Sequence, residues 1–420
     1  MLQNLCNTFR DFQDIKMSDL ALEYTDEKIN LLNTHSSNLS KKGIFIRVLS
    51  FIKKAVFNSS FYLPNPNTEK ILVACNSLNE YEAALFLKEK KDINVIFIGS
   101  YPYKHNFASY VFGFLSLPLI IIKILNEENK RLNNSLPYTL DQLMISSGVY
   151  FSYRRIFNKN VKTLFISNHL SPETIVAMHL AKKNKIKIVY LQHSQLVSKY
   201  PPIETNFYLL SGIDSLRKLK KINKFVDESK ICFVGTPKLD NLKFKQKISA
   251  QNISVCVNPG ADFLKVKKLI LLLKNHFKSC QISIRPHPGI RSKYLKSYRN
   301  LNLQNVSLVK PNAETLFKFL LRNDIVISDD SGIYYEAGYA GNISLSYSMS
   351  NSSKDWYDLE GANHKISKSP SELINRIKTI VKANVNKRND FKIFFANINT
   401  KNDGKAKELA LNFLMKENLI

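Results

Sequence analysis

The chain has 420 residues and carries 61 lysines and arginines against 34 aspartates and glutamates, which gives a net charge of +27. A hydrophobic content of 44% excludes global disorder, and the length allows two domains of ordinary size. The positive excess indicates a polyanionic partner or an anionic membrane, although part of it reads as a solvated lysine surface.

Several classes of protein are disfavoured by the absence of their sequence patterns. The five cysteines form no Cys-x-x-Cys pair, so we expect buried free thiols and neither a disulfide framework nor a zinc site. Zinc-finger, RNP and helix-turn-helix patterns are missing, so we expect no nucleic-acid partner. Residues 1–20 do not read as a signal peptide, and no apolar run reaches the ~18–20 residues of a bilayer span. The sequence therefore predicts a cytoplasmic protein.

Residues 41–57 read as a basic amphipathic helix. Apolar side chains recur at helical spacing between Ile44 and Phe57, and the positive charges are those of Lys41, Lys42, Arg47, Lys53 and Lys54. Such a helix either lies on an anionic leaflet or packs on its own domain. Both alternatives stay open, and the first would place the protein peripherally on the inner face of the membrane.

Short apolar strands alternate with helical segments from Ile71 onward, which is the pattern of parallel βαβ units. The strands predicted in the first half are 71–74, 95–99, 163–167, 187–191, 207–210 and 231–234. Residues 110–125 are the most apolar stretch and are interrupted by Pro118. They predict either a buried helix or a face that dips into a membrane, with burial preferred.

The second half restarts the same pattern after a lysine-rich boundary at about residues 241–251. Strands are predicted at 253–257, 282–286, 325–328 and 343–346, followed by helices in 370–385 and in the tail. The predicted fold is α/β with two Rossmann-like parallel-sheet domains facing each other across a cleft. Its expected parts are an N-terminal helical segment 1–68, a first domain 69–245, a second domain 246–388, and a C-terminal helix in 389–420 that returns toward the first domain.

Two short motifs follow strands of the second half. Residues 282–289 read Ile-Ser-Ile-Arg-Pro-His-Pro-Gly, and residues 325–337 read Ile-Val-Ile-Ser-Asp-Asp-Ser-Gly-Ile-Tyr-Tyr-Glu-Ala. Ligands of open α/β sheets sit at the carboxyl ends of the strands, and a helix start such as Ser331-Gly332 holds anions. The pair therefore predicts a nucleotide-phosphate site.

Within this site His287 is the strongest candidate, because its flanking prolines fix the direction of an imidazole that stabilises a departing phosphate. Arg285 is expected either to pair with a phosphate or to bridge to Asp329. Further expected phosphate-binding residues are Pro259, Gly260, Pro288, Gly289, Ser328, Asp330, Ser331 and Gly332.

An Arg-x-His-Pro turn followed by a Ser-Asp-x-Ser turn resembles the donor half of GT-B glycosyltransferases that use cytidine-linked donors. The resemblance covers roughly residues 160–380 and includes two branches. One contains bacterial sialyltransferases and transferases of Kdo or nonulosonic acids, and the other contains teichoic-acid polymerases that use CDP-glycerol or CDP-ribitol. The chain departs from the second branch where Gly332 interrupts its paired serines. The resemblance also implies that Glu336 accepts hydrogen bonds from ribose hydroxyls.

The first domain is expected to supply the acceptor site and the general base. His169 and His193 each follow a predicted strand, and a histidine is a plausible base on pKa grounds. The segment Tyr-Leu-Gln-His at 190–193 is similar to the Tyr-x-Gln-His segment of capsule and lipopolysaccharide transferases. An aspartate base within an acidic-Gly motif, found in many sialyltransferases, has no copy in the first half. The choice between the two histidines stays open.

Together, the residues and the resemblance imply a metal-independent transferase that has no cofactor and uses a CMP-sugar donor as co-substrate. The expected sugar is acidic, of the sialic, pseudaminic, legionaminic or Kdo type, and the expected acceptor is a glycan or a lipid-linked glycan. The alternatives are a phosphotransferase that uses CDP-glycerol or CDP-ribitol, and a non-catalytic capsule assembly protein that binds polyanions.

Overall fold

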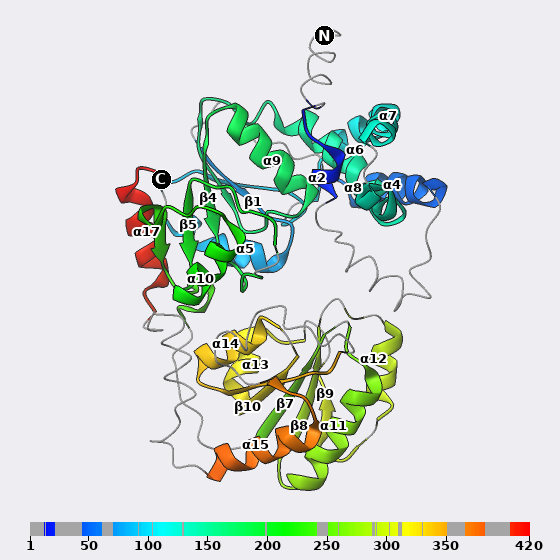
Figure 1. The fold of residues 1–420 in the computed structure, drawn as a ribbon, viewed down its shortest axis with the longest axis vertical. Coiled ribbons are helices and arrows are strands. Elements are labelled where there is room, and N and C mark those ends of the chain that lie inside the picture. The colour runs from blue at the N-terminus through cyan, green and yellow to red at the C-terminus, as the bar shows by residue number, and fades with distance from the viewer. Residues whose placement is uncertain are drawn as a thin grey trace.

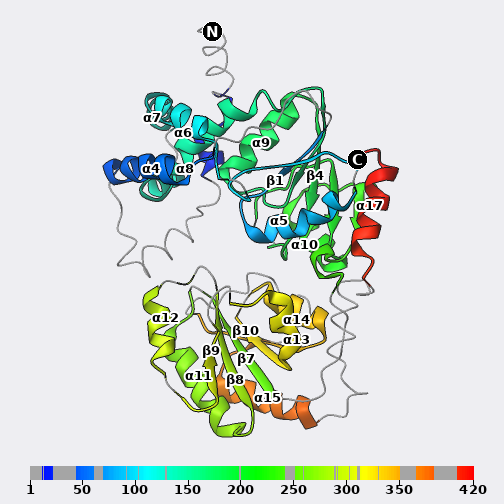
Figure 2. The ribbon, with the colours of Figure 1, turned by 180° about the vertical axis from the view of Figure 1, so that it is seen from behind.

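The structure contains two parallel β-sheets, one after the other along the chain (Figures 1 and 2). It is a computed structural model that describes residues 12, 14–21, 44–60, 70–90, 92–102, 104–127, 130–197, 200–241, 251–258, 260–287, 290, 292–301, 303–309, 313–329, 331–350, 366–382 and 404–420. Each sheet has six strands, and helices cover both of its faces.

The first sheet has the strand order β2-β1-β3-β4-β5-β6, and all its strands are parallel. Its strands are β1 Lys70–Ala74, β2 Val95–Ile98, β3 Val161–Ile166, β4 Lys187–Leu191, β5 Phe207–Leu210 and β6 Ile231–Phe233. Successive strand residues alternate between the two faces, so Leu164 and Phe165 enter different cores. Apolar residues at both positions are expected for a parallel sheet that is covered on both sides.

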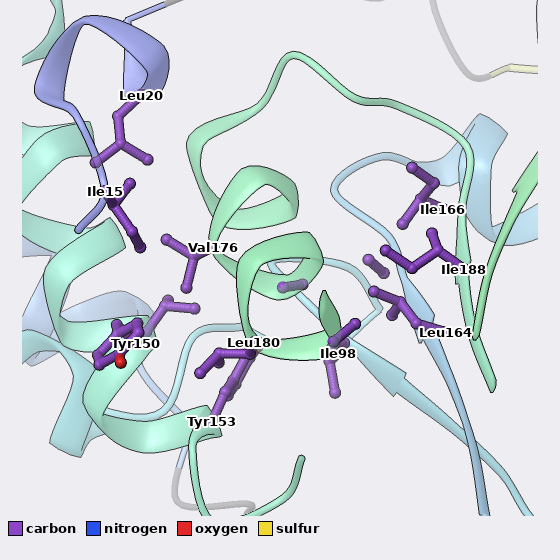
Figure 3. Packing of buried hydrophobic residues seen from close by; sticks show 14 of the residues in the cluster. Ile15, Leu20, Ile98, Tyr150, Tyr153, Leu164, Ile166, Val176, Leu180 and Ile188 are labelled. Atoms are coloured by element: carbon purple, nitrogen blue, oxygen red, sulfur yellow. The ribbon is translucent and has the colours of Figure 1, made fainter. Parts of the chain in front are cut away.

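One face of this sheet packs against the helices that precede β3 and those that follow it. They are α2 Met17–Leu20, α4 Ile44–Asn58, α6 Phe107–Leu115, α7 Leu117–Glu127, α8 Lys130–Tyr153, α9 Pro172–Lys183 and α10 Ile213–Ile222. Figure 3 shows Val176 and Leu180 of α9 between the sheet residues Leu164 and Ile188 and the ring of Tyr150 on α8. This layer holds α4, α6 and α7 on the outer side of α8.

The other face is closed by helices from the two ends of the domain. They are α5 Leu78–Ala84, the 3-10 segment Leu85–Glu89 and the C-terminal helix α17 Ala406–Lys416. Ala410 and Leu414 of α17 are fully buried in the same cluster as Phe165 and Val189. The last segment of the chain is therefore part of the core of the first domain.

The second sheet has the order β12-β11-β10-β7-β8-β9, again all parallel. Its strands are β7 Asn252–Val257, β8 Gln281–Pro286, β9 Val306–Leu308, β10 Ile325–Ser328, β11 Ile343–Tyr347 and β12 Ile366–Ser367. Helices α11 Phe263–His276, α12 Ser292–Arg299 and α15 Pro370–Lys382 pack on one face, and α13 Leu316–Arg322 and α14 Ile333–Ala340 pack on the other.

The predicted fold class, α/β with two Rossmann-like parallel sheets, is confirmed, and ten of the twelve strands lie where the sequence predicts them. The sequence missed β9 and β12, which have only three and two residues. The preference for a buried helix in residues 110–125 was wrong in part, because the stretch forms α6 and α7, and side chains such as Phe114 and Leu125 are exposed. Among the described residues no single helix is long and apolar enough to cross a bilayer. Helices α6 and α7 together have the required length and apolarity, but their axes are bent by 56° where they meet.

The position of α17 in the core leads to a test of stability. Leu414→Ala removes a fully buried side chain, so we expect the free energy of unfolding to fall by about 2–4 kcal/mol, the range for a cavity of this kind. Leu409→Ala in the same helix is the control, because Leu409 is 44% exposed. Urea unfolding followed by circular dichroism measures both, and equal effects of the two changes would contradict the described packing.

Candidate functional site

The two motif strands end at one edge of the second sheet. Strands β8 and β10 both pair with β7, one on each side of it, with Pro286 opposite Val257 and Ser328 opposite Cys256. Because all three strands are parallel, their carboxyl ends lie at the same edge. The structure therefore brings the turns after β7, β8 and β10 together, which is the arrangement expected for a ligand site of an open α/β sheet.

The two basic residues of the first motif occupy different surroundings. The His287 side chain is exposed, and its backbone N–H donates to the Val257 carbonyl. Desolvation by the protein around the ring lowers the pKa of His287 below its usual value. The guanidinium of Arg285 lies 4.2 Å from the ring of Phe319 and has a buried nitrogen, Nη1, without a hydrogen-bond partner. Arg285 forms no ion pair with Asp329, so the expected alternative of a bridge between them is not seen among the described residues.

The second motif forms the start of α14. The Ser328 side chain is fully buried and its hydroxyl has no partner, while the Asp329 carboxylate accepts a hydrogen bond from the backbone N–H of Ser350 at 2.8 Å. Gly332 precedes the first residue of the helix and has a helical φ of −55°. A Cβ atom on Gly332 or on Gly260 would meet no heavy atom within 4 Å, so the space next to both turns is open. Pro259, Pro288, Gly289 and Asp330 lie outside the described residues.

Glu336 on α14 faces the first domain. Its carboxylate pairs at 2.5 Å with the ammonium group of Lys238, which lies in the turn after β6 and is 8% exposed. Beside this pair, Lys218 of α10 is fully buried, forms an ion pair with Asp214 at 2.7 Å and lies 5.5 Å from the centre of the Tyr335 ring. The carboxyl group expected to contact ribose is thus engaged by a lysine of the opposite domain.

His193 lies next to the Lys238–Glu336 pair. Its Nδ1 lies 2.8 Å from the Ser167 carbonyl oxygen, so Nδ1 carries the hydrogen and donates it. Its other nitrogen, Nε2, therefore carries the lone pair of the neutral ring. Burial and the positive charge of Lys238 lower the pKa of His193 to about 4, against smaller opposing effects of the Ser167 carbonyl and the Glu336 carboxylate. The ring is therefore neutral at neutral pH.

His169 has a different environment. Its ring is buried, its Nε2 lies 3.1 Å from the Pro201 carbonyl oxygen, and the rings of Tyr190 and Tyr200 approach it edge-on. Burial lowers its pKa to about 4 as well. Since the ring is held by packing on three sides, we interpret His169 as a structural residue, which leaves His193 as the candidate base.

A polar cluster at the carboxyl ends of β1 and β3 was missed in the sequence. The Asn76 side chain donates to Ser171 at 2.7 Å and to Thr174 at 3.1 Å, and the backbone N–H of Asn76 donates to the Glu80 carboxylate at 2.9 Å. Burial is the main reason that the pKa of Glu80 is raised, and the negative charge of Glu173 adds to it. Glu173 in turn lies 3.4 Å from the imidazole of His105. These contacts join the loops after β1, β2 and β3, so no local sequence signal marks them.

Taken together, the geometry offers open turns at a sheet edge on the second domain and a neutral histidine on the first. The open turns at Gly260 and Gly332, the start of α14 and the unpaired nitrogen of Arg285 suit a phosphate. His193, Lys238 and Glu336 stand at the contact between the domains. The arrangement can hold a negatively charged ligand and transfer a proton beside it.

Comparison with known proteins identifies the fold. No protein-family profile matches the sequence, and no curated protein sequence matches it. UDP-GlcNAc 2-epimerase from Neisseria meningitidis, solved with bound UDP-GlcNAc, superimposes with a TM-score of 0.55 at 15% identity over 83% of this chain and 100% of the epimerase. A second UDP-N-acetylglucosamine 2-epimerase gives 0.53 at 11% identity over 84% and 97%. The wall teichoic acid polymerase TagF gives 0.47 at 13% identity over 89% and 97%. The two epimerase superpositions and the two parallel sheets show that the chain has the GT-B fold that the sequence predicts.

The surroundings of His193 predict how its pKa responds to the loss of one charge. In Lys238→Met the positive charge that disfavours protonation is gone while the Glu336 carboxylate remains, so the pKa of His193 should rise from about 4. The titration of the His193 ring resonances by NMR measures this shift. Lys220→Met is the control, because Lys220 pairs with Glu228 on the surface of the same domain. An unchanged titration in Lys238→Met would show that the lysine does not act on His193.

Proposed function

We propose that this protein is a glycosyltransferase that transfers an acidic sugar from a CMP-sugar to the acceptor of a surface polysaccharide. The observation that carries the proposal is that the turns after β7, β8 and β10 lie at one edge of the second sheet, while His193 of the first domain is neutral and lies beside the Lys238–Glu336 pair. The sugar would be of the sialic, pseudaminic, legionaminic or Kdo type. The acceptor would be a glycan or a lipid-linked glycan.

The second domain would bind the donor. The start of α14 and Ser331 would hold the phosphate, and the neutral imidazole of His287 would donate a hydrogen bond to the oxygen that carries the leaving charge. Ribose hydroxyls would hydrogen-bond to the Glu336 carboxylate and take the place of Lys238. The released ammonium group of Lys238 would then face the donor phosphate.

The first domain would supply the base. An acceptor hydroxyl would attack the anomeric carbon, its proton would go to Nε2 of His193, and the bond between that carbon and the phosphate oxygen would break to release CMP. A base with a pKa of about 4 is a weak proton acceptor at neutral pH. A bound phosphate would add negative charge beside the ring and draw Lys238 away from it, and both changes raise the pKa of His193. Donor binding would thus activate the base.

The acceptor would lie along the polar cluster of Asn76, Glu80 and Glu173. These side chains surround the carboxyl ends of β1 and β3, next to the strand end whose Ser167 carbonyl orients His193. Hydroxyl-rich sugars suit such a set of carboxylates, amides and hydroxyls, because each group can accept or donate a hydrogen bond.

A CDP-glycerol or CDP-ribitol phosphotransferase is the second candidate. Open space lies next to two neighbouring turns, at Gly260 and at Gly332, which suits a donor with two phosphates as well as one. A non-catalytic protein that binds polyanions is the third candidate, and it requires neither His193 nor His287 to support turnover.

Nucleotide release separates these candidates. We expect CMP to be released from CMP-sugars in a donor panel that also contains CDP-glycerol and CDP-ribitol. His287→Ala should lower the turnover number about 10²–10³-fold, the effect of losing one hydrogen-bond donor to a transition-state charge. Because His287 is exposed, the variant should keep the thermal stability of the wild type. Release of CMP from CDP-alcohols alone favours the second candidate, and no release from any donor favours the third.

The start of α14 gives a binding prediction that does not depend on turnover. Ser331→Ala should weaken CMP binding by about 1–2 kcal/mol if the hydroxyl contacts a charged phosphate. Gly332→Val should weaken it further, because its side chain fills the open space, and the helical φ of −55° predicts little strain in the unliganded fold. Isothermal titration calorimetry measures the affinity, with thermal unfolding as a check of the fold. Unchanged CMP affinity in both variants would place the nucleotide elsewhere.

A further inference from the structure

An exposed apolar surface covers three neighbouring helices of the first domain, α4, α6 and α7, and we call it the α4–α6–α7 surface. Its exposed apolar side chains are Phe45, Ile46, Leu49, Ile52, Val56 and Phe57 on α4, Phe107, Val111, Phe114 and Leu115 on α6, and Ile121, Ile122 and Leu125 on α7. The most exposed are Phe45 at 73%, Leu125 at 71% and Phe57 at 70%. Clusters of this kind on one face mark a binding surface, whereas single exposed apolar residues are ordinary.

Helix α4 buries only a narrow part of its apolar surface, chiefly Phe51, which is 2% exposed. Its charged residues Arg47, which is largely buried, and Lys54, which is exposed, pair with the buried carboxylate of Asp141, at 3.3 Å and 2.6 Å. Arg47 also donates to the Pro137 carbonyl at 2.7 Å. Much of its apolar stripe, by contrast, faces away from the domain. A helix held in this way by ion pairs has its apolar face available for another apolar medium.

Helix α6 is fixed just as firmly, so its outer face is a permanent surface. A Cβ atom on Gly148 of α8 would lie 1.6 Å from the Ser109 carbonyl oxygen, and one on Gly113 would lie 2.4 Å from that of Met144. Backbones this close allow no side chain between them. Helix α6 therefore cannot rotate to bury Phe114 and Leu115 without separating from α8.

The charges around this surface favour an anionic partner. Helices α4 and α6 contain no acidic residue, and the acidic residue of α7, Glu127, accepts hydrogen bonds from the backbone N–H groups of Met17 and Ser18. Exposed lysines such as Lys53 and Lys104 lie on α4 and just before α6. Apolar side chains bordered by lysines match the acyl chains and anionic headgroups of a bilayer interface.

The surface also adjoins the polar cluster of the first domain. The loop before α6 pairs with the residue after α4, because the backbone of Ser60 bonds to that of His105 at 2.9 Å and accepts from Phe107 at 2.7 Å. His105, in that loop, lies 3.4 Å from Glu173. One short loop thus connects the apolar surface to the polar cluster.

We propose that the α4–α6–α7 surface inserts into the interface of an anionic phospholipid bilayer, with α4 and α6–α7 lying in its plane. The apolar side chains enter the acyl region, and the bordering lysines contact the headgroups. In addition, and resting on the function proposed above, the loop at His105 leads the polar headgroup of a lipid-linked acceptor from the bilayer to Glu173 and Glu80.

Co-sedimentation with vesicles tests the docking independently of catalysis. The full chain should sediment with vesicles of mixed phosphatidylcholine and phosphatidylglycerol, and less with phosphatidylcholine alone. Phe45→Ser and Leu125→Ser should each weaken vesicle binding about tenfold, the effect of withdrawing one large apolar side chain from an apolar medium. The matched controls are Phe225→Ser and Leu264→Ser, which change side chains that are 84% and 70% exposed outside the surface, and they should bind as the wild type does.

Three outcomes overturn the proposal: absence of the wild type from the pellet, an equal loss in the control variants, or unchanged binding of both surface variants. The alternative is a subunit interface. It is identified if the wild type does not bind vesicles, forms a dimer in analytical ultracentrifugation, and becomes monomeric in Phe45→Ser. CMP binding measured without vesicles should be the same in all four variants as in the wild type. A wild-type protein that docks on vesicles but does not bind CMP would count against the proposed function alone.

Discussion

Three consecutive residues after β6 join the two domains, and the site depends on how they do so. Lys238 pairs with Glu336 of the second domain, and Leu239 is buried among apolar residues of that domain that include Phe319 and Tyr335. Asp240 accepts hydrogen bonds from the backbone N–H groups of residues 406 and 407, at the start of α17. The place where the chain leaves the first domain is thus tied to both the second domain and the returning helix. His193 meets Glu336 because this junction is fixed.

In the part of the chain that the structure describes, the site holds three positive groups, of which Lys238 is paired with Glu336 and Lys218 with Asp214. Arg285 has a buried nitrogen without a partner, and Lys238 and Lys218 stand at the domain contact. Like charges in partly buried positions repel one another, so an anionic ligand stabilises the arrangement. Burial is the main reason that the pKa of His193 is lowered, and the positive charge of Lys238 adds to it. Phosphate recognition and the protonation state of the histidine are therefore linked through one electrostatic environment.

The sequence predicts those features that follow from local pattern. Fully buried parallel strands read as continuous apolar runs, so ten strands and the fold class were predictable, whereas β9 and β12 are too short to form such a run. His169 and His193 both follow strands and look equivalent in the sequence, and only tertiary contacts separate them. The pairing of Lys238 with a residue 98 positions away has no local signal. The apolar stripe of a helix does not reveal in the sequence whether it faces the core or the outside. For this reason the sequence alone does not decide whether α4 packs on its own domain or lies on a membrane.

The position of α17 has a consequence for the order in which the chain is made. The first domain is assembled from two stretches of sequence, and the whole second domain is synthesised between them. Until residues 406–416 leave the ribosome, the sheet face that contains Phe165 and Val189 lacks its final cover. The second domain is continuous and becomes complete earlier, so it can reach its native packing first. The second domain can therefore finish folding before the first domain does. Until then, the first domain exposes an apolar sheet face that chaperones can bind.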